Sequence, residues 1–232
     1  MKRSHELRLV ACGLATSLLL AGCDLGYGCS KDSPAGSALL TNPGADAFHQ
    51  TAPDSFIARF ETSRGSFAVQ VVRAWAPRGA DRFYTLVRNG FYDGNRFFRV
   101  IPGFVVQWGI NGDPGVSQAW ARQCIPDDAV RQGNTRRAMS FAFGRPHTRT
   151  TQVFVNYGMN PRLNELGFAA FGEVIDGMVV LDSLYGAYGE GPPRGAGPDP
   201  VKVGELGNAY LDSEFPRLDS IIRARVVSVS KR

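Results

Sequence analysis

The chain has 232 residues, of which 44% are hydrophobic and 20% are charged, close to the averages of soluble globular proteins. This balance excludes general disorder and a protein with several membrane spans, and the length fits one large domain or two small ones. The formal net charge of +5 is too small to argue for nucleic acid, so we expect no nucleic-acid partner. The 27 Gly and 14 Pro indicate many turns and strands.

Residues 1–22 have the pattern of a secretory signal peptide. Basic residues at positions 2, 3 and 8 precede an apolar run, 9–21, that is too short to span a bilayer, which needs about 20 residues. The run leads into Leu20-Ala21-Gly22-Cys23, which resembles a bacterial lipobox and predicts cleavage before Cys23 and lipidation of its thiol. The alternative is an ordinary signal peptide with an incidental cysteine.

We expect a protein of the bacterial cell envelope, lipid-anchored with its domain outside the cytoplasm. Asp24 resembles a retention signal and favours the inner membrane.

Residues 23–54 are expected to form a flexible tether behind the lipidated Cys23. Gly, Ser, Ala, Pro and Asp dominate this stretch, and its apolar residues are scattered. After processing and acylation, the cysteines left are Cys29 and Cys124. An oxidising envelope permits a bridge between them, but neither has a CxxC or metal-like spacing, so we expect no disulfide and no metal site.

Residues 55–232 are expected to form one domain. Alternating apolar and polar residues predict strands at 56–61 and 66–72, joined by a turn at 63–65. Pro77 can begin a helix that ends at Asn89-Gly90. The later expected elements are strands at 96–101, 104–108, 138–143, 152–157, 168–174 and 221–229, a helix at 177–185, a Gly/Pro loop at 186–200 and a short helix at 209–215. Many short strands with two longer helices suggest a small β-barrel with helices over its open ends.

Arg99 and Gln107 lie inside the otherwise apolar pair of strands at 96–108. An arginine is almost never buried unpaired, and an amide in a core needs partners. One interpretation is an edge strand with both groups in water, or an arginine satisfied by an internal carboxylate. The other is a functional site.

The run FFRVIPGFVVQWG, residues 97–109, resembles the signature of the cyclophilins, which are peptidyl-prolyl cis-trans isomerases. Residues 139–142 and 151–155 resemble two further strands of that family, and residues 163–174 resemble a third conserved segment. The blocks follow in the right order, so the resemblance covers residues 55–232. It implies a mainly β fold, a closed eight-stranded antiparallel β-barrel capped by two helices, and an enzyme without a cofactor.

The resemblance assigns catalysis to Arg99. An X–Pro bond isomerises over a barrier of ~18–20 kcal/mol, because amide resonance stiffens the C–N bond. A guanidinium beside the imide nitrogen can donate to the lone pair that emerges as the bond twists, and this favours the transition state. Arginine suits the role because it stays charged at any working pH.

The resemblance also implies how the substrate is bound. Gln107 would hydrogen-bond the substrate backbone and hold Arg99 in place, while Phe104 and Phe154 would form the floor of an apolar pocket for the proline ring. The other residues expected to contact the substrate are Val105, Ala142, Phe143, Gln152, Leu163 and Phe168.

Three of these positions depart from the family pattern. Phe143 stands where many members have Asn, Phe168 where many have His, and Leu163 near a position where some have Trp. These changes make the rim of the pocket more apolar and argue against tight cyclosporin binding. His147 is expected to be a solvated loop residue, and Trp108 has no functional interpretation.

The sequence therefore predicts a peptidyl-prolyl isomerase acting on unfolded or extended polypeptides of the cell envelope. Its expected partners are proline-containing polypeptides and, through the lipid anchor, a membrane, and the protein is expected to be a monomer. The alternative is a proline-peptide binding or chaperone module with little turnover. A lipid- or solute-binding barrel does not explain the spacing of the arginine and the glutamine.

Overall fold

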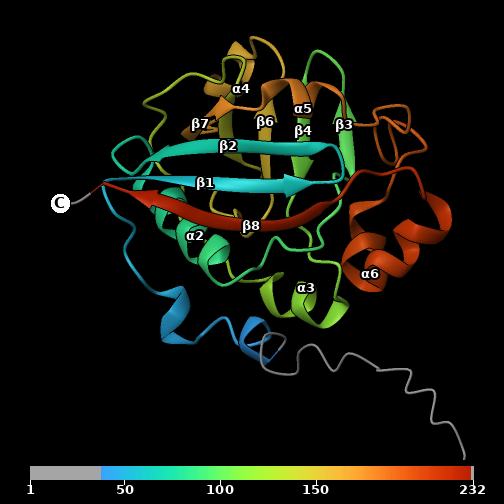
Figure 1. Ribbon diagram of the computed structural model, residues 1–232, viewed down its shortest axis with the longest axis horizontal. Helices are drawn as coiled ribbons and strands as arrows, with labels where there is room; N and C mark the ends of the chain where they lie inside the picture. Colours follow the sequence, from blue (N-terminus) through green and yellow to red (C-terminus); the bar gives the residue numbers. More distant parts are fainter. Residues whose placement is uncertain (1–37, 231–232) are drawn as a thin grey trace, which may run out of the picture. The chain divides into compact units, whose positions relative to one another are not determined.

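Eight antiparallel strands form one sheet in the part of the chain that the structure, a computed structural model, describes, residues 38–230 (Figure 1). Across the sheet their order is β3-β4-β6-β5-β7-β2-β1-β8. The strands are β1 (Ser55–Thr62), β2 (Gly65–Val72), β3 (Arg99–Ile101), β4 (Val105–Trp108), β5 (Ala138–Phe141), β6 (Val153–Asn156), β7 (Ala170–Asp176) and β8 (Ile221–Val229). The mainly β fold and the number of strands are as expected from the sequence.

The expectation of a closed barrel is wrong, because the edge strands β3 and β8 are not joined by a ladder and the sheet is an open half-barrel. An isolated bridge between Arg96 and Ser220, just ahead of the two strands, and a hydrogen bond from the Gly94 amide to the Ile221 carbonyl connect these edges. The chain turns at Gly94, whose φ is +72°, and again at Pro102-Gly103. Between the two turns, only Arg99–Ile101 forms a strand, and it pairs with β4 on its other side.

Five α-helices lie wholly within the described residues, where the sequence predicts two longer helices and one short one. The long helix from Pro77 is confirmed, the one expected at 177–185 is shorter, and the short one expected at 209–215 is the end of a longer helix. The helices are α2 (Pro77–Arg88), α3 (Pro114–Trp120), α4 (Pro161–Glu165), α5 (Met178–Asp182) and α6 (Pro200–Glu214). The carboxylate of Asp113 accepts from the first backbone amides of α3, and that of Asp199 accepts from an amide of α6.

Aromatic side chains form the centre of the core between the sheet and α2. Phe60 stacks on Phe67 with ring centroids 4.7 Å apart, and both rings meet Trp108 edge-on. Phe83 of α2 packs against Phe60 and against Phe171 of β7. Trp108 is fully buried, so its place in the motif has a packing explanation.

Residues 38–54 pack on the domain, so the expectation of a flexible tether as far as residue 54 is wrong for them. Phe48, in the short 3-10 helix Asp46–Phe48, is 6% exposed and meets Trp120 edge-on at 4.8 Å. The indole Nε1 of Trp120 donates to the Leu40 carbonyl at 2.8 Å. The backbone amide of Ala52 donates to the Asp81 carboxylate of α2 at 2.8 Å. These contacts offset the entropy of ordering the segment.

Residues 1–37 and 231–232 lie outside the described residues. The signal peptide, the lipidation of Cys23 and the absence of a bridge between Cys29 and Cys124 therefore stay predictions. Within residues 38–230, no helix is long and apolar enough to cross a bilayer.

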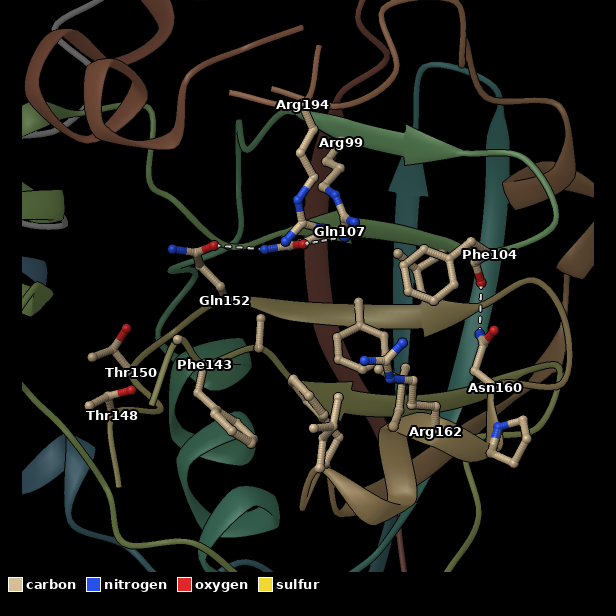
Figure 2. A pocket seen from close by; sticks show the side chains of 18 of the residues that line it. Arg99, Phe104, Gln107, Phe143, Thr148, Thr150, Gln152, Asn160, Arg162 and Arg194 are labelled. Carbon is tan, nitrogen blue, oxygen red and sulfur yellow. Dashed lines mark hydrogen bonds between the residues drawn. The ribbon is translucent and has the colours of Figure 1, made fainter. Parts of the chain in front are cut away.

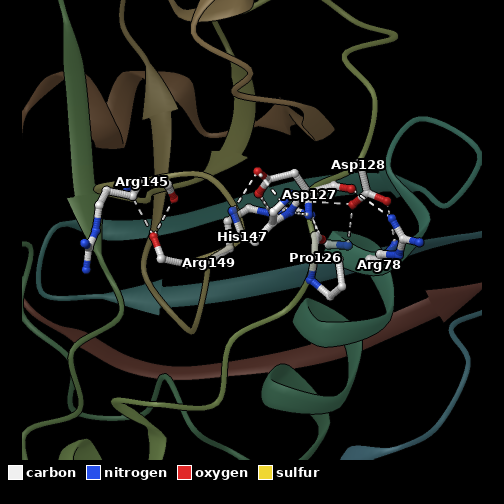
Figure 3. Close-up of polar contacts among 9 residues, drawn as sticks. Arg78, Pro126, Asp127, Asp128, Arg145, His147 and Arg149 are labelled. Carbon is white, nitrogen blue, oxygen red and sulfur yellow. Dashed lines mark hydrogen bonds and ion pairs between the residues drawn. The ribbon is translucent and has the colours of Figure 1, made fainter.

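A buried ion pair fixes the loop that precedes β6 (Figure 3). Arg149, with 2% of its side chain exposed, donates to Asp128 at 3.1 Å and to the Pro126 carbonyl. Asp128 also accepts from the backbone amide of Gly79 in the first turn of α2, at 2.9 Å. The arginine thus ties two loops to a helix. His147 in the same loop is 69% exposed, as expected from the sequence.

Replacement of Arg149 tests this anchor. In Arg149→Met, Asp128 stays 4% exposed without its charged partner, so we expect the free energy of unfolding to fall by about 3–5 kcal/mol, measured by urea denaturation. The matched control, Arg223→Met, breaks an exposed ion pair with Glu61 and should change stability little. If the free energy of unfolding fell equally in the two variants, the buried pair would contribute no more to stability than the exposed one.

Candidate active site

The turn at Pro102-Gly103 places Arg99 of β3 directly opposite Gln107 of β4. Gly103 takes the positive φ, +76°, that this turn requires. The next strand across the sheet, β6, places Phe154 opposite Gln107. Two residues that are eight positions apart in the sequence thus become cross-strand neighbours, and an aromatic ring follows on the next strand.

A chain of hydrogen bonds crosses these strands (Figure 2). Arg99 donates from Nη1 to Gln107 Oε1 at 3.1 Å, and Gln107 donates from Nε2 to Gln152 Oε1 at 2.9 Å. The expectation that Gln107 helps hold Arg99 agrees with this contact. Arg99 is neither in bulk water nor buried: its side chain is 19% exposed.

Glu190 binds the other edge of the same guanidinium. Arg99 donates from Nε to Oε2 at 2.9 Å and from Nη2 to Oε1 at 2.6 Å. These hydrogen bonds lower the pKa of Glu190 below its ordinary value, so the carboxylate is ionised at neutral pH. Of the five N–H groups of a guanidinium, three donate in the contacts to Glu190 and Gln107, and two are left for a ligand.

All the residues that the sequence assigned to catalysis or substrate binding line one pocket of about 1020 Å³. They are Arg99, Phe104, Val105, Gln107, Ala142, Phe143, Gln152, Phe154, Leu163 and Phe168. The one other predicted site residue, Cys23, lies outside the described residues. A pocket of this size can take a short stretch of polypeptide.

Four phenylalanine rings give the pocket its apolar surface. Phe143 stacks on Phe168 with centroids 4.1 Å apart, and Phe168 meets Phe154 edge-on at 5.6 Å. Phe104 lies under the Arg99 guanidinium, whose Cζ is 5.5 Å from the ring centroid. The cation is therefore in contact with the apolar part of the pocket and does not stand apart from it.

Nine further residues, which the sequence does not single out, line the same pocket. They are Gly144, Thr148, Thr150, Met159, Asn160, Pro161, Arg162, Leu166 and Arg194. They come from α4 and from loops, where no hydrophobic period marks a residue as pocket-facing. Asn160 also donates to the Phe104 carbonyl at 3.1 Å and so supports the pocket floor (Figure 2).

The charged groups that line the pocket are three arginines, Arg99, Arg162 and Arg194. In the view of Figure 2, Arg99 and Arg194 enter from the same side and end above Gln107. No group of three His, Cys, Asp or Glu residues within 38–230 is arranged to hold a metal ion. The arrangement offers hydrogen-bond donors and an apolar slot to a ligand.

Comparison with known proteins agrees with this geometry. The model of the family described as cyclophilin type peptidyl-prolyl cis-trans isomerase matches residues 57–201. Peptidyl-prolyl cis-trans isomerase B of Escherichia coli is 34% identical over 178 residues, which are 73% of this chain and 98% of that protein. A peptidyl-prolyl cis-trans isomerase of Acinetobacter baylyi is 31% identical and covers 63% of this chain and 82% of its own length.

A solved structure shares the fold. The cyclophilin of Cryptosporidium parvum, whose structure was also determined in the presence of the dipeptide Ala-Pro, superposes with a TM-score of 0.54 at 21% identity. The match covers 76% of this chain and 99% of that one. The signature residues on β3 and β4, the family model and these relatives lead to one conclusion: the chain belongs to the cyclophilin family of peptidyl-prolyl cis-trans isomerases.

Proposed function

We propose that this isomerase acts on Xaa–Pro bonds in unfolded or extended polypeptides of the bacterial cell envelope. One observation supports the site most strongly. The Arg99 guanidinium, which has two N–H groups not used by Glu190 or Gln107, lines the same pocket as an aromatic slot. The pocket has room for a short stretch of polypeptide, and the slot suits an apolar ring.

The aromatic slot would hold the pyrrolidine ring while the acyl side of the bond rotates. Phe104 and Phe154 would form its floor, with Leu163 and the stacked pair of Phe143 and Phe168 around it. Ala142 and Gln152 would contact the substrate backbone, with Val105 beside them. Because the pyrrolidine ring is held still, the binding energy favours the twisted state of the Xaa–Pro bond over its planar state.

Arg99 would donate to the imide nitrogen as that nitrogen becomes pyramidal. In the planar ground state the lone pair belongs to the amide resonance, so this hydrogen bond strengthens only as the bond twists. Stabilisation of ~7 kcal/mol would accelerate the reaction about 10⁵-fold. No proton transfer and no covalent intermediate are needed.

Removal of the guanidinium should abolish most turnover without unfolding the protein. We expect kcat/KM of Arg99→Ala on a Xaa-Pro tetrapeptide to fall about 100-fold, as when one preorganised donor is lost. The assay is protease-coupled and is checked against refolding of a proline-limited protein. The control is Arg223→Ala, which changes an arginine of β8 outside the pocket. Equal activity of wild type and Arg99→Ala would exclude Arg99 as the catalytic residue.

The rate should not depend on pH around neutrality. The titratable side chains that line the pocket are arginines, and the pKa of Glu190 is lowered, so the Arg99–Glu190 pair is intact above that pKa. We expect a constant kcat/KM from about pH 6 to pH 9 and a fall only when acid protonates Glu190. A bell-shaped profile centred near neutrality would indicate a general acid or base that this account lacks.

We further propose that the protein is a monomeric lipoprotein, acylated at Cys23 and retained at the inner membrane through Asp24. The support is the Leu20-Ala21-Gly22-Cys23 sequence behind a basic and apolar leader. Since residues 38–54 pack on the domain, the segment available as a tether is at most 24–37. Client proteins would therefore be those whose extended segments come close to the membrane surface.

Substitution of Cys23 tests the anchor. In the native host, labelled palmitate should mark the wild type but not Cys23→Ser, and only the wild type should sediment with the inner membrane. Cys124→Ser is the control, since Cys124 is an exposed thiol outside the lipobox-like sequence. Retention of the label in Cys23→Ser would contradict the lipoprotein assignment.

A further inference from the structure

Arg99 owes its orientation to a residue that is distant in the sequence. Glu190 lies 91 positions further along the chain and forms two hydrogen bonds to one edge of the guanidinium. The carboxylate is 30% exposed and the arginine 19% exposed, so the pair lies at the wall of the pocket and is partly shielded from water. A two-point contact of this kind fixes the plane of a guanidinium, which one hydrogen bond cannot do.

The loop that carries Glu190 is built to hold it. The Glu190 carbonyl accepts from the backbone amide of Gly197 at 2.8 Å. A Cβ added at Gly195 would lie 2.3 Å from that carbonyl oxygen, so glycine is required for the chain to close here. Loop residues 186–199 therefore fold back on themselves around residue 190.

A second apolar cluster anchors the same loop to α6. Tyr188 meets Phe215 edge-on with centroids 5.0 Å apart, and it meets Tyr185 in the same way. Phe215 belongs to a buried group with Tyr210 and with Phe98, the residue just before Arg99. The loop and β3 are thus held by one set of packed side chains, and Glu190 has little freedom to leave Arg99.

We propose that Glu190 is a positioning residue for catalysis, which orients the Arg99 guanidinium so that its two remaining N–H groups face the substrate imide. This inference rests on the proposed function of Arg99. Glu190 is not among the residues that line the pocket, so this role gives it contact with Arg99 and none with the substrate. Its contribution should consequently appear in turnover more than in peptide affinity.

The test compares Glu190→Gln and Glu190→Ala with wild type in the full chain. The glutamine keeps one acceptor oxygen but loses the charge and the two-point contact, whereas alanine loses both. We expect kcat to fall about tenfold in Glu190→Gln and further in Glu190→Ala, with KM for the tetrapeptide within about twofold of wild type. Glu214→Gln is the matched control: it changes an exposed glutamate at the end of α6 and should leave both constants unchanged.

A second readout does not depend on activity. In the wild type, the Nε–Hε resonance of Arg99, assigned by its loss in Arg99→Lys, should exchange slowly with water because Glu190 accepts this hydrogen. In Glu190→Ala it should exchange fast while the rest of the spectrum is preserved.

The outcomes separate this inference from the proposed function. Unchanged kcat in both Glu190 variants, with Arg99→Ala inactive, would overturn the positioning role alone. An increase in kcat would also overturn it, since it would show that Glu190 competes with the substrate for Arg99. If the wild type had no isomerase activity, the proposed function would fail, and fast exchange of the Arg99 resonance in the wild type would then reject the positioning contact as well.

Discussion

A guanidinium at the edge of a sheet can stabilise a twisted imide only if something else fixes its plane. A free arginine would satisfy its N–H groups with water and lose rotamer freedom on meeting the substrate. Here Gln107 and Glu190 occupy three of the N–H groups, and the Phe104 ring lies beneath the cation. The cost of ordering the side chain is thus met when the protein folds. The geometry of the pocket depends on this one constraint.

The rest of the fold can be understood as the support for that side chain. The tight turn at Pro102-Gly103 brings β3 against β4, and the fully buried Trp108 fixes the far end of β4 in the aromatic core. On the other side, α6 and its apolar cluster hold the loop that delivers Glu190.

Local sequence was sufficient to predict the hairpin of β3 and β4. Arg99 and Gln107 each stand four residues from Gly103 at the centre of the turn, so their cross-strand pairing follows from the alternation of a hairpin. The sequence leaves two interpretations of Arg99 open: an arginine on an edge strand or paired with a carboxylate, and a residue of a functional site. The structure has features of both, since Arg99 lies on an edge strand, is paired with a carboxylate and lines the pocket. Glu190 could not be predicted, because nothing in a Gly/Pro loop indicates which distant strand it will meet.

Other differences have equally specific causes. The two unpredicted helices, α3 and α4, begin at Asp113-Pro114 and Asn160-Pro161, and α6 begins at Asp199-Pro200. An Asp or Asn followed by Pro is a signal for a helix start, and here it outweighed the glycines and prolines that suggested loops. Composition alone predicts a tether at residues 38–54, but the ring of Phe48 packs against Trp120, and composition cannot reveal such a tertiary contact.

The central claim is that the pocket twists a bound prolyl bond, and exchange NMR on a Xaa-Pro peptide measures this most directly. With the protein present at a small fraction of the peptide concentration, we predict cis–trans exchange cross-peaks for the proline protons, together with transferred contacts from the proline ring to the aromatic slot. A peptide that binds and shows those contacts, yet gives no exchange beyond the uncatalysed rate, would contradict the account and identify a proline-peptide binding module instead.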